Sequence, residues 1–337
     1  MMSTLVDTLA RPLHDLRISV TDRCNFRCTY CMPKEVFGKQ YQFLPQEQLL
    51  SFDEIEQVTR AFVALGVRKV RLTGGEPLMR KDLESLIARL AALPGVQDIA
   101  LTTNGSFPLE RVHSLKAAGL KRMTVSLDAL DDETFKRMND VDFPVERVLE
   151  WIAESARAGF APVKVNMVVK RGVNEHAILP MARYFRQHGH ILRLIEYMDV
   201  GHSNGWRMDD VLTARQMVDI ISAELPLEPL EANYRGEVAE RYRYADGSGE
   251  LGIIASVSQP FCGDCSRARI SADGRLFTCL FALGGADLRG LVRRGADDAA
   301  LQAAIAAVWQ KRADRYSELR SANTAALPKV EMSYIGG

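Results

Sequence analysis

Apolar residues recur along the first two thirds of the chain in short β-like runs, each followed by an amphipathic, helix-like stretch. The β-like runs are LRISV (16–20), VRKVRLT (67–73), DIALTT (98–103), RMTVSL (122–127), PVKVNMVV (162–169) and LRLIEYM (192–198). Six such strand–helix units in series predict an α/β fold with parallel strands and right-handed crossovers. The periodicity fits a doubly wound sheet and an incomplete β/α barrel equally well.

Two of these predicted strands carry a polar face. In VRKVRLT, Lys69, Arg71 and Thr73 lie on one side, and in PVKVNMVV Lys164 and Asn166 do so. Strands inside a parallel sheet are ordinarily apolar on both faces. Edge strands would explain the pattern, and so would a barrel lumen lined to hold a polar, anionic ligand, which is the interpretation we favour.

The strand–helix rhythm stops after about residue 210. The stretch 226–261 is irregular, and RARISADGRLFTC then predicts a hairpin around Asp273 and Gly274. That hairpin would place Cys279 opposite Ala268 and bring it back toward Cys265. A helical run (298–311) and an extended tail ending in YIGG follow. We therefore predict two regions, 1–225 and 226–337.

The charge balance and hydropathy narrow the protein's class. Lys and Arg together number 43, as do Asp and Glu, which argues against a broad nucleic-acid-binding surface. No apolar run is long enough to span a bilayer, and the first fifteen residues lack the basic-then-apolar pattern of a signal peptide. These features predict a cytoplasmic protein without membrane or nucleic-acid partners, in which clustered thiols more often bind metal than form disulfides.

The six cysteines form two triplets at opposite ends of the chain. Cys24, Cys28 and Cys31 have the spacing C-x3-C-x2-C, and Cys262, Cys265 and Cys279 have the spacing C-x2-C-x13-C. A four-iron cluster usually takes four thiolates, so three of them leave one iron open. The alternative is a zinc site completed by another residue, such as His14 for the first triplet or Asp264 for the second.

The strand run 67–73 is followed by a glycine pair. The sequence TGGEP, residues 73–77, lies where an α/β ligand site is expected, beyond the carboxyl end of a strand. Glycines there let bare backbone approach a ligand. Combined with the first triplet, this motif becomes a strong signal of a ligand site.

With these motifs in place, the chain resembles the radical S-adenosylmethionine (SAM) superfamily. That superfamily's signature, C-x3-C-x-φ-C with φ aromatic, is met by Cys24, Cys28, Tyr30 and Cys31, and GGEP matches the motif that binds the amino group of SAM. The resemblance implies that SAM chelates the open iron of a [4Fe-4S] cluster. An electron from that cluster would cleave SAM to a 5′-deoxyadenosyl radical, while the protein supplies orientation and shielding.

Further motifs narrow the resemblance to one family. DLRISVTDRCNFRCTYCMPKEVFG, MDVGHSNGW, CSRARIS and the terminal YIGG are similar to the MoaA-type GTP 3′,8-cyclases of molybdenum cofactor biosynthesis, across essentially the whole chain. The fold implied is an incomplete (β/α)6 TIM-type barrel, closed on its open side by a C-terminal region with a second [4Fe-4S] cluster on Cys262, Cys265 and Cys279. The reaction implied is abstraction of H3′ from GTP and attack of the C3′ radical on guanine C8, giving (8S)-3′,8-cyclo-7,8-dihydroguanosine 5′-triphosphate.

The same resemblance implies a set of site residues at matching motif positions. Those for SAM are Tyr30, Gly75, Ser126 and Met198. Those for GTP are Arg17, Lys69, Arg71, Thr102, Lys164, Arg193, Arg267 and Arg269. Residues expected to act in catalysis are Arg17, Arg267, Arg269, Gly336 and Gly337. A triphosphate would also explain the polar strand faces, because Arg forks and Lys charges both bind phosphate oxygens.

The cofactors implied are two [4Fe-4S] clusters and SAM. The partners implied are a flavodoxin- or ferredoxin-like electron donor and a downstream cyclic pyranopterin monophosphate synthase, with the chain a monomer or homodimer. Two other functions stay open: a different radical SAM enzyme that modifies a peptide or RNA, and a non-enzymatic iron–sulfur electron carrier. A carrier would need neither an open iron nor a cationic lumen.

Overall fold

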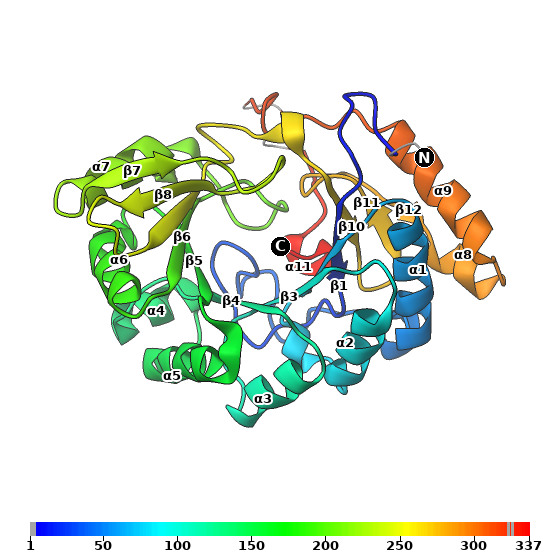
Figure 1. The fold of residues 1–337 in the computed structure, drawn as a ribbon, viewed down its shortest axis with the longest axis horizontal. Coiled ribbons are helices and arrows are strands. Elements are labelled where there is room, and N and C mark those ends of the chain that lie inside the picture. The colour runs from blue at the N-terminus through cyan, green and yellow to red at the C-terminus, as the bar shows by residue number, and fades with distance from the viewer. Residues whose placement is uncertain (1–4, 322–323, 325–326) are drawn as a thin grey trace.

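The computed structural model describes residues 5–321, 324 and 327–337, and within them twelve strands form one continuous sheet. The strand order is β12-β11-β10-β1-β2-β3-β4-β5-β6-β9-β8-β7. The sheet curls around a central space (Figure 1). Because the strand order is linear, the two edge strands do not pair and the sheet does not close on itself. The predicted incomplete barrel is confirmed, and the doubly wound alternative is wrong.

Six parallel strands form the barrel itself. They are β1 (Asp15–Ser19), β2 (Lys69–Thr73), β3 (Asp98–Thr103), β4 (Arg122–Ser126), β5 (Lys164–Val169) and β6 (Ile191–Glu196). All six predicted strands are confirmed, with ends that differ by at most two residues.

Helices cover the outer face of these strands (Figure 1). They are α1 (Phe52–Ala64), α2 (Leu83–Ala92), α3 (Glu110–Ala117), α4 (Asp132–Asn139), α5 (Val145–Ser155), α6 (Ile178–Gln187) and α7 (Ala214–Ser222). The first begins at a capping box, in which the Ser51 side chain accepts from the Glu54 N–H and the Glu54 side chain accepts from the Ser51 N–H. Large side chains such as Phe62, Trp151 and Phe185 are fully buried between helices and sheet. None of the helices in the described part of the chain is long and apolar enough to cross a membrane.

The polar faces predicted for two strands are explained by their place in the sheet. β2 lies between β1 and β3, and β5 lies between β4 and β6, so neither is an edge strand. Along β5, Val165 and Met167 are buried while Lys164 and Asn166 are partly accessible. The apolar face therefore packs on the helices, and the polar face lines the barrel interior.

The C-terminal region extends both ends of the barrel sheet. β9 (Glu250–Ile254) pairs with β6 and carries β8 (Glu240–Tyr244) and β7 (Leu227–Leu230). At the other end, β10 (Arg267–Ile270) pairs with β1 and carries β11 (Arg275–Phe277) and β12 (Ala286–Asp287). Two outer helices follow, α8 (Arg289–Arg293) and α9 (Asp298–Gln310), and the short α11 (Met332–Ile335) lies inside the barrel (Figure 1).

The predicted hairpin around Asp273 and Gly274 forms, but its register differs. Arg269 pairs with Phe277 and Ile270 with Leu276, and the Ser271 N–H donates to the carbonyl of Arg275. The loop is therefore three residues long, 272–274, where the prediction assumed two. The expected pairing of Cys279 with Ala268 is wrong by one residue, because this register would place position 278 opposite Ala268.

Candidate functional site

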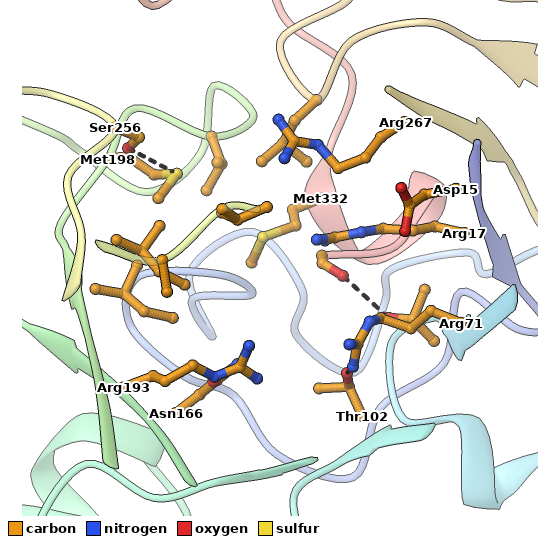
Figure 2. A pocket seen from close by; sticks show the side chains of 18 of the residues that line it. Asp15, Arg17, Arg71, Thr102, Asn166, Arg193, Met198, Ser256, Arg267 and Met332 are labelled. Carbon is orange, nitrogen blue, oxygen red and sulfur yellow. Dashed lines mark hydrogen bonds between the residues drawn. The ribbon is translucent and has the colours of Figure 1, made fainter. Parts of the chain in front are cut away.

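A cavity of about 360 Å³ occupies the barrel interior and is lined by all six cysteines. Every site residue predicted from the sequence lines it except Gly336, whose neighbour Gly337 does. Figure 2 shows the side chains of Arg17, Arg71, Arg193 and Arg267 pointing from different parts of the wall into this shared space. The curled sheet thus brings segments from near both ends of the chain to one site.

The first cysteine triplet lies on the loop that follows β1. Phe26 anchors this loop in the core, with its ring 5.5 Å from that of Phe143, and Arg27 donates to the Cys24 carbonyl at 2.7 Å. Burial raises the pKa of the Cys24 thiol to about 12. Burial and then the charges of neighbouring groups, among them the other thiols of the triplet, raise the pKa of Cys28 as well. Three desolvated thiols on one loop fit a cationic iron–sulfur core, whose charge stabilises the thiolates.

The glycine pair of TGGEP packs directly against the start of this loop. The Gly75 N–H donates to the Thr21 carbonyl at 2.8 Å, and a Cβ at Gly75 would lie 2.3 Å from the Arg23 carbonyl oxygen. Only glycine permits this approach. The motif therefore has a structural reason of its own, which is to carry β2 alongside the backbone that leads into Cys24.

Glu76, from the same motif, is a buried carboxylate at the cavity wall. It accepts hydrogen bonds from the Thr103 hydroxyl at 2.8 Å and the Asn104 N–H at 2.8 Å. Burial raises the pKa of Glu76 to about 7, although these hydrogen bonds oppose the shift. Asn104, which was not among the predicted site residues, also lines the cavity, and its position in TTNG beyond β3 was the available signal.

The residues predicted to contact SAM lie around this first triplet. Tyr30 donates through its hydroxyl to Asp128 at 2.9 Å, and Ser126 ends β4 in register with Asn166. Met198 follows the end of β6, where its sulfur accepts from the Ser256 hydroxyl at 3.5 Å (Figure 2). They therefore come from the cysteine loop and from the carboxyl ends of strands, as ligand sites in such barrels do.

Eleven Lys and Arg side chains line the cavity. Seven of them are the predicted GTP contacts Arg17, Lys69, Arg71, Lys164, Arg193, Arg267 and Arg269, and the other four are Arg11, Arg122, Arg241 and Arg312. Thr102 accepts from Arg71 Nη1 at 3.0 Å. Among the described residues, Arg193 Nε and Arg267 Nη1 are buried without a hydrogen-bond partner. Such donors cost free energy unless a ligand satisfies them.

The cations also lower one another's pKa values. Burial first, and then the charges of Arg269, Arg71 and Arg267, hold the pKa of Arg17 well below its usual value. Burial and the charges of Arg193 and Arg122 lower the pKa of Lys164 to about 8. A polyanion bound here would relieve both the desolvation and the mutual repulsion.

The six carboxylates in the cavity wall neutralise the eleven cations only in part: the charge of Asp15 raises the pKa of Arg17 and that of Glu237 raises the pKa of Lys164, but some carboxylates also have other partners. Asp15 lies 3.2 Å from His14 Nδ1 and accepts from the Ser266 hydroxyl at 2.8 Å. Glu250 pairs with Arg241. The wall therefore keeps an excess of positive charge facing the cavity.

The second triplet closes the side of the cavity opposite β5 and β6. Cys262 begins a short 3₁₀ helix, Cys265 precedes β10, and Cys279 follows β11. Although burial alone would raise the pKa of Cys265, the charges of Arg267 and Arg312 lower it to about 6. Arg267 and Arg269, both on β10, line the cavity.

The zinc alternatives for either triplet lack their extra ligand. His14 pairs with Asp15, and Asp264 accepts from Arg235 at 2.6 Å. Among the described residues no three His, Cys, Asp or Glu side chains are grouped to hold a single metal ion. Three thiols without a fourth protein ligand fit the separate corners of a four-iron cluster better than one tetrahedral zinc ion.

The C-terminal tail is packed inside the barrel. Ile335 is fully buried, and the Gly336 carbonyl accepts from Arg269 Nη1. Gly336 has φ of +79°, and a Cβ there would lie 2.3 Å from Thr73 Cγ2. The tail therefore lies against the end of β2, next to GGEP.

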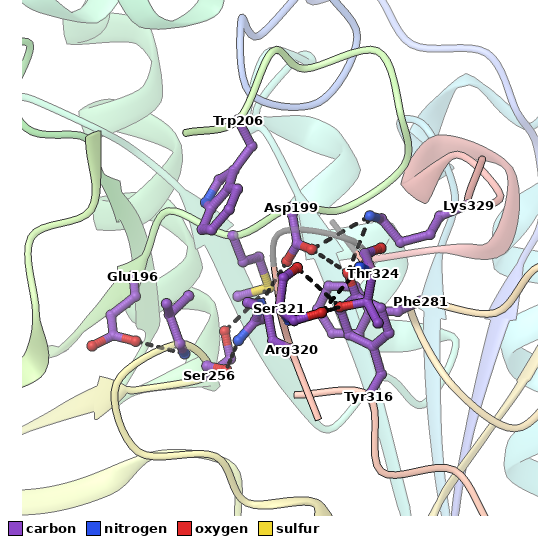
Figure 3. Close-up of polar contacts among 12 residues, drawn as sticks. Glu196, Asp199, Trp206, Ser256, Phe281, Tyr316, Arg320, Ser321, Thr324 and Lys329 are labelled. Atoms are coloured by element: carbon purple, nitrogen blue, oxygen red, sulfur yellow. Dashed lines mark hydrogen bonds and ion pairs between the residues drawn. The ribbon is translucent and has the colours of Figure 1, made fainter. Parts of the chain in front are cut away.

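A buried polar cluster beyond β6 connects the Met198 segment to the tail. It was not predicted from the sequence. Asp199 accepts from Arg320 Nε at 2.9 Å and from the Tyr316 hydroxyl, and it pairs with Lys329 at 3.4 Å (Figure 3). Arg320 also donates to the Ser256 carbonyl at 2.8 Å. Asp199 lies in the MDVGHSNGW motif, but no periodicity or motif marks its partners, which are up to 130 positions away.

Comparison with known proteins gives a consistent result. Residues 18–185 match the Radical SAM superfamily, and residues 190–318 match the family described as Molybdenum Cofactor Synthesis C. The chain is 52% identical to a GTP 3′,8-cyclase of Acidothermus cellulolyticus over 362 aligned positions, covering 100% of both chains. It is 51% identical to a GTP 3′,8-cyclase of Xanthomonas axonopodis pv. citri and 47% identical to one of Staphylococcus carnosus, again with 100% of each chain covered.

Solved structures share the fold at low sequence identity. Streptococcus suis SuiB bound to S-adenosylmethionine superposes with a TM-score of 0.61 at 16% identity, covering 94% of this chain and 72% of that one. SuiB bound to its precursor peptide SuiA gives a TM-score of 0.62 at 14% identity, covering 83% and 64%. These neighbours support the barrel architecture alone.

Proposed function

The chain belongs to the GTP 3′,8-cyclases of the radical SAM superfamily, and we propose that its two cysteine triplets and the cations between them carry out that family's reaction. It is therefore an enzyme of molybdenum cofactor biosynthesis that acts on GTP. The observation that carries the residue assignments is one cavity lined by six cysteines and eleven Lys and Arg side chains. An electron carrier would not need that cationic wall.

Cys24, Cys28 and Cys31 would hold a [4Fe-4S] cluster with an open iron for SAM. Bound there, the cluster and SAM supply a 5′-deoxyadenosyl radical. Tyr30, Gly75, Ser126 and Met198 would orient SAM, since they line the same cavity as the triplet from the cysteine loop and from the carboxyl ends of strands. The Tyr30 hydroxyl is itself held by Asp128, which keeps the aromatic ring in place.

The cationic wall would bind the triphosphate of GTP. Arg71 and Arg193 both donate to the Thr124 hydroxyl, at 3.2 and 3.3 Å, so their guanidinium groups are held in position before a ligand arrives. Arg17, Lys69, Thr102, Lys164, Arg267 and Arg269 complete the set. Cys262, Cys265 and Cys279 would hold a second [4Fe-4S] cluster.

The tail would exclude water from the reacting atoms. Arg269 holds the Gly336 carbonyl, and α11 places Met332 and Gly337 at the cavity wall. A radical reaction requires such shielding, because solvent or nearby protein groups otherwise quench the radical. Gly336 and Gly337 fit here because they lack side chains.

The remaining partners are also proposals. A flavodoxin- or ferredoxin-like protein would supply the electron, and a cyclic pyranopterin monophosphate synthase would take the product. Six free thiols and a GTP substrate favour the cytoplasm. The protein would work as a monomer or homodimer.

An anaerobic assay tests the assignment. The enzyme is incubated with SAM, dithionite and each nucleoside triphosphate in turn, and 5′-deoxyadenosine and modified nucleotide are separated by chromatography. Cys24→Ala, Cys28→Ala or Cys31→Ala should abolish 5′-deoxyadenosine formation. Cys262→Ala, Cys265→Ala or Cys279→Ala should instead spare the first cluster and lower GTP binding and cyclisation.

Iron and sulfide analysis provides the matched control. Two four-iron clusters predict about eight irons in the wild type and about four in each second-triplet variant. Normal 5′-deoxyadenosine production by a first-triplet variant would refute the placement of SAM. Zinc in place of the second set of irons would refute the second cluster.

A further inference from the structure

A buried guanidinium lies against one thiol of the second triplet. Arg312 Nη2 donates to Cys265 Sγ at 3.0 Å, and Arg312 Nη1 donates to the Cys265 carbonyl at 2.6 Å. The Arg312 side chain is only 1% exposed. By contrast, the thiols of Cys24 and Cys279 accept main-chain N–H groups, at 3.4 and 3.5 Å.

Several groups hold Arg312 in this position. Its guanidinium pairs with Asp7 and Asp314, each at 3.4 Å, and lies 4.6 Å from the centre of the Trp309 ring. Arg11 shares Asp7 at 2.6 Å and donates to the Cys262 carbonyl at 2.8 Å. Two buried arginines thus share the fully buried carboxylate of Asp7, and these pairs fix the Arg312 guanidinium with its Nη2 directed at Cys265 Sγ.

The first triplet has a different arrangement. Its nearest arginine, Arg27, donates to the carbonyls of Cys24 and Phe26, both at 2.7 Å, and to the Phe37 carbonyl at 2.8 Å. Those bonds brace the loop without donating to a sulfur. Two clusters with the same three-thiolate ligand set would therefore differ in the charge and hydrogen bonding at their sulfurs.

We propose that Arg312 is a positioning residue for the second iron–sulfur cluster, which orients Cys265 as a thiolate ligand and shifts the reduction potential of that cluster to a more positive value. Reduction adds negative charge to a cluster, so a cation that donates to a ligand sulfur stabilises the reduced form. This inference rests on the proposed function, in which the second triplet holds a four-iron cluster.

The test measures the reduction potential of the second cluster in a full-length chain that lacks the first cluster. Cys24→Ala, Cys28→Ala and Cys31→Ala together remove the first cluster, so the remaining signal belongs to the second. In this background the midpoint potential is measured by redox titration with electron paramagnetic resonance, for Arg312 and for Arg312→Lys and Arg312→Gln. Arg320→Lys is the matched control, since Arg320 is a buried arginine paired with Asp199 that donates to a carbonyl rather than a thiol.

The midpoint potential should become more negative in Arg312→Lys, which cannot donate to both Cys265 Sγ and the Cys265 carbonyl in the same way. It should become more negative still in Arg312→Gln, which also loses the positive charge. Arg320→Lys should leave it unchanged. Selective loss of the second cluster in a folded Arg312 variant also supports the positioning role. If Arg312→Gln does not fold, the lysine variant decides.

An Arg312→Lys chain with full second-cluster iron and the wild-type potential would overturn the inference alone. An unsubstituted chain that binds no iron at the second triplet would overturn the proposed function and the inference with it. The iron content therefore separates the two failures.

Discussion

Substitution of Gly336 by alanine tests whether the tail must lie against GGEP for the enzyme to form product. The new Cβ would lie 2.3 Å from Thr73 Cγ2, in a residue whose φ is +79°. Two separate costs follow, because the left-handed backbone disfavours alanine and the methyl groups overlap. The backbone cost is about 1–2 kcal/mol, and overpacking of this kind costs about 1–3 kcal/mol.

These costs have to be compared with the free energy of the contacts that hold the tail in place. Burial of Ile335 contributes about 1.5–3 kcal/mol, and the bond from the charged Arg269 to the Gly336 carbonyl about 1.5–3 kcal/mol. The two sums are similar, so we expect the tail of Gly336→Ala to leave its position while the barrel stays folded. The unfolding temperature should change little. SAM binding and the iron content should be retained, and product formation should be lost.

Two further variants separate the costs. Gly189→Ala is the control for backbone strain, since Gly189 has φ of +67° and a Cβ there would meet nothing within 4 Å. Thr73→Ser removes the methyl group that the new Cβ would strike, and the remaining Thr73 atoms lie 3.5 Å away. Adding Thr73→Ser to Gly336→Ala should recover about 1–3 kcal/mol of the tail's docking free energy, a roughly 5- to 150-fold gain in turnover over Gly336→Ala.

The assay is product formation from GTP under anaerobic conditions, with each variant compared to its own single-substitution reference. Wild-type turnover in Gly336→Ala would show that the tail tolerates displacement and would refute the reasoning. A double variant that remains as inactive as Gly336→Ala would show that the contact with Thr73 is not the cause.

Two other substitutions test the cationic wall. Arg267→Ala or Arg269→Ala should each weaken GTP binding about ten- to a hundredfold, because hydrogen bonds to charged groups are worth about 1.5–3 kcal/mol, and lysine should rescue only in part; unchanged affinity in equilibrium binding would place both outside the GTP site. The pKa of Lys164, which burial and neighbouring arginines lower to about 8, predicts that GTP affinity falls as the pH rises through 8, since the free protein loses this cation there. Lys164→Met should bind GTP more weakly and lack that part of the pH dependence, and an identical pH profile in the variant would contradict the assignment.

Local patterns in the sequence were sufficient for the strands and for the loop that carries three thiols. The alternation of Lys69 and Arg71 with apolar residues depends on the two-residue repeat of a strand, which is a short-range property of the backbone. The spacing of Cys24, Cys28 and Cys31 likewise keeps three thiols on one loop in any fold. These features were predicted correctly because neighbours in sequence determine them.

Other features depended on contacts that no local pattern encodes. The hairpin register at Cys279 was predicted one residue out, because loop length follows from backbone geometry rather than from the Asp273–Gly274 pair alone. Family resemblance was needed to predict a barrel, since hydrophobic periodicity is the same for a barrel and an open sheet.

The Arg312–Cys265 and Asp199–Lys329 contacts had no signal in the sequence. They join residues 47 and 130 positions apart, and they form only when the C-terminal region has packed across the barrel. Sequence alone determined which side chains could bind clusters and phosphate. The tertiary structure decided that they meet, because curling the sheet with β10 beside β1 and β9 beside β6 buries both triplets, the cations and the tail around one cavity.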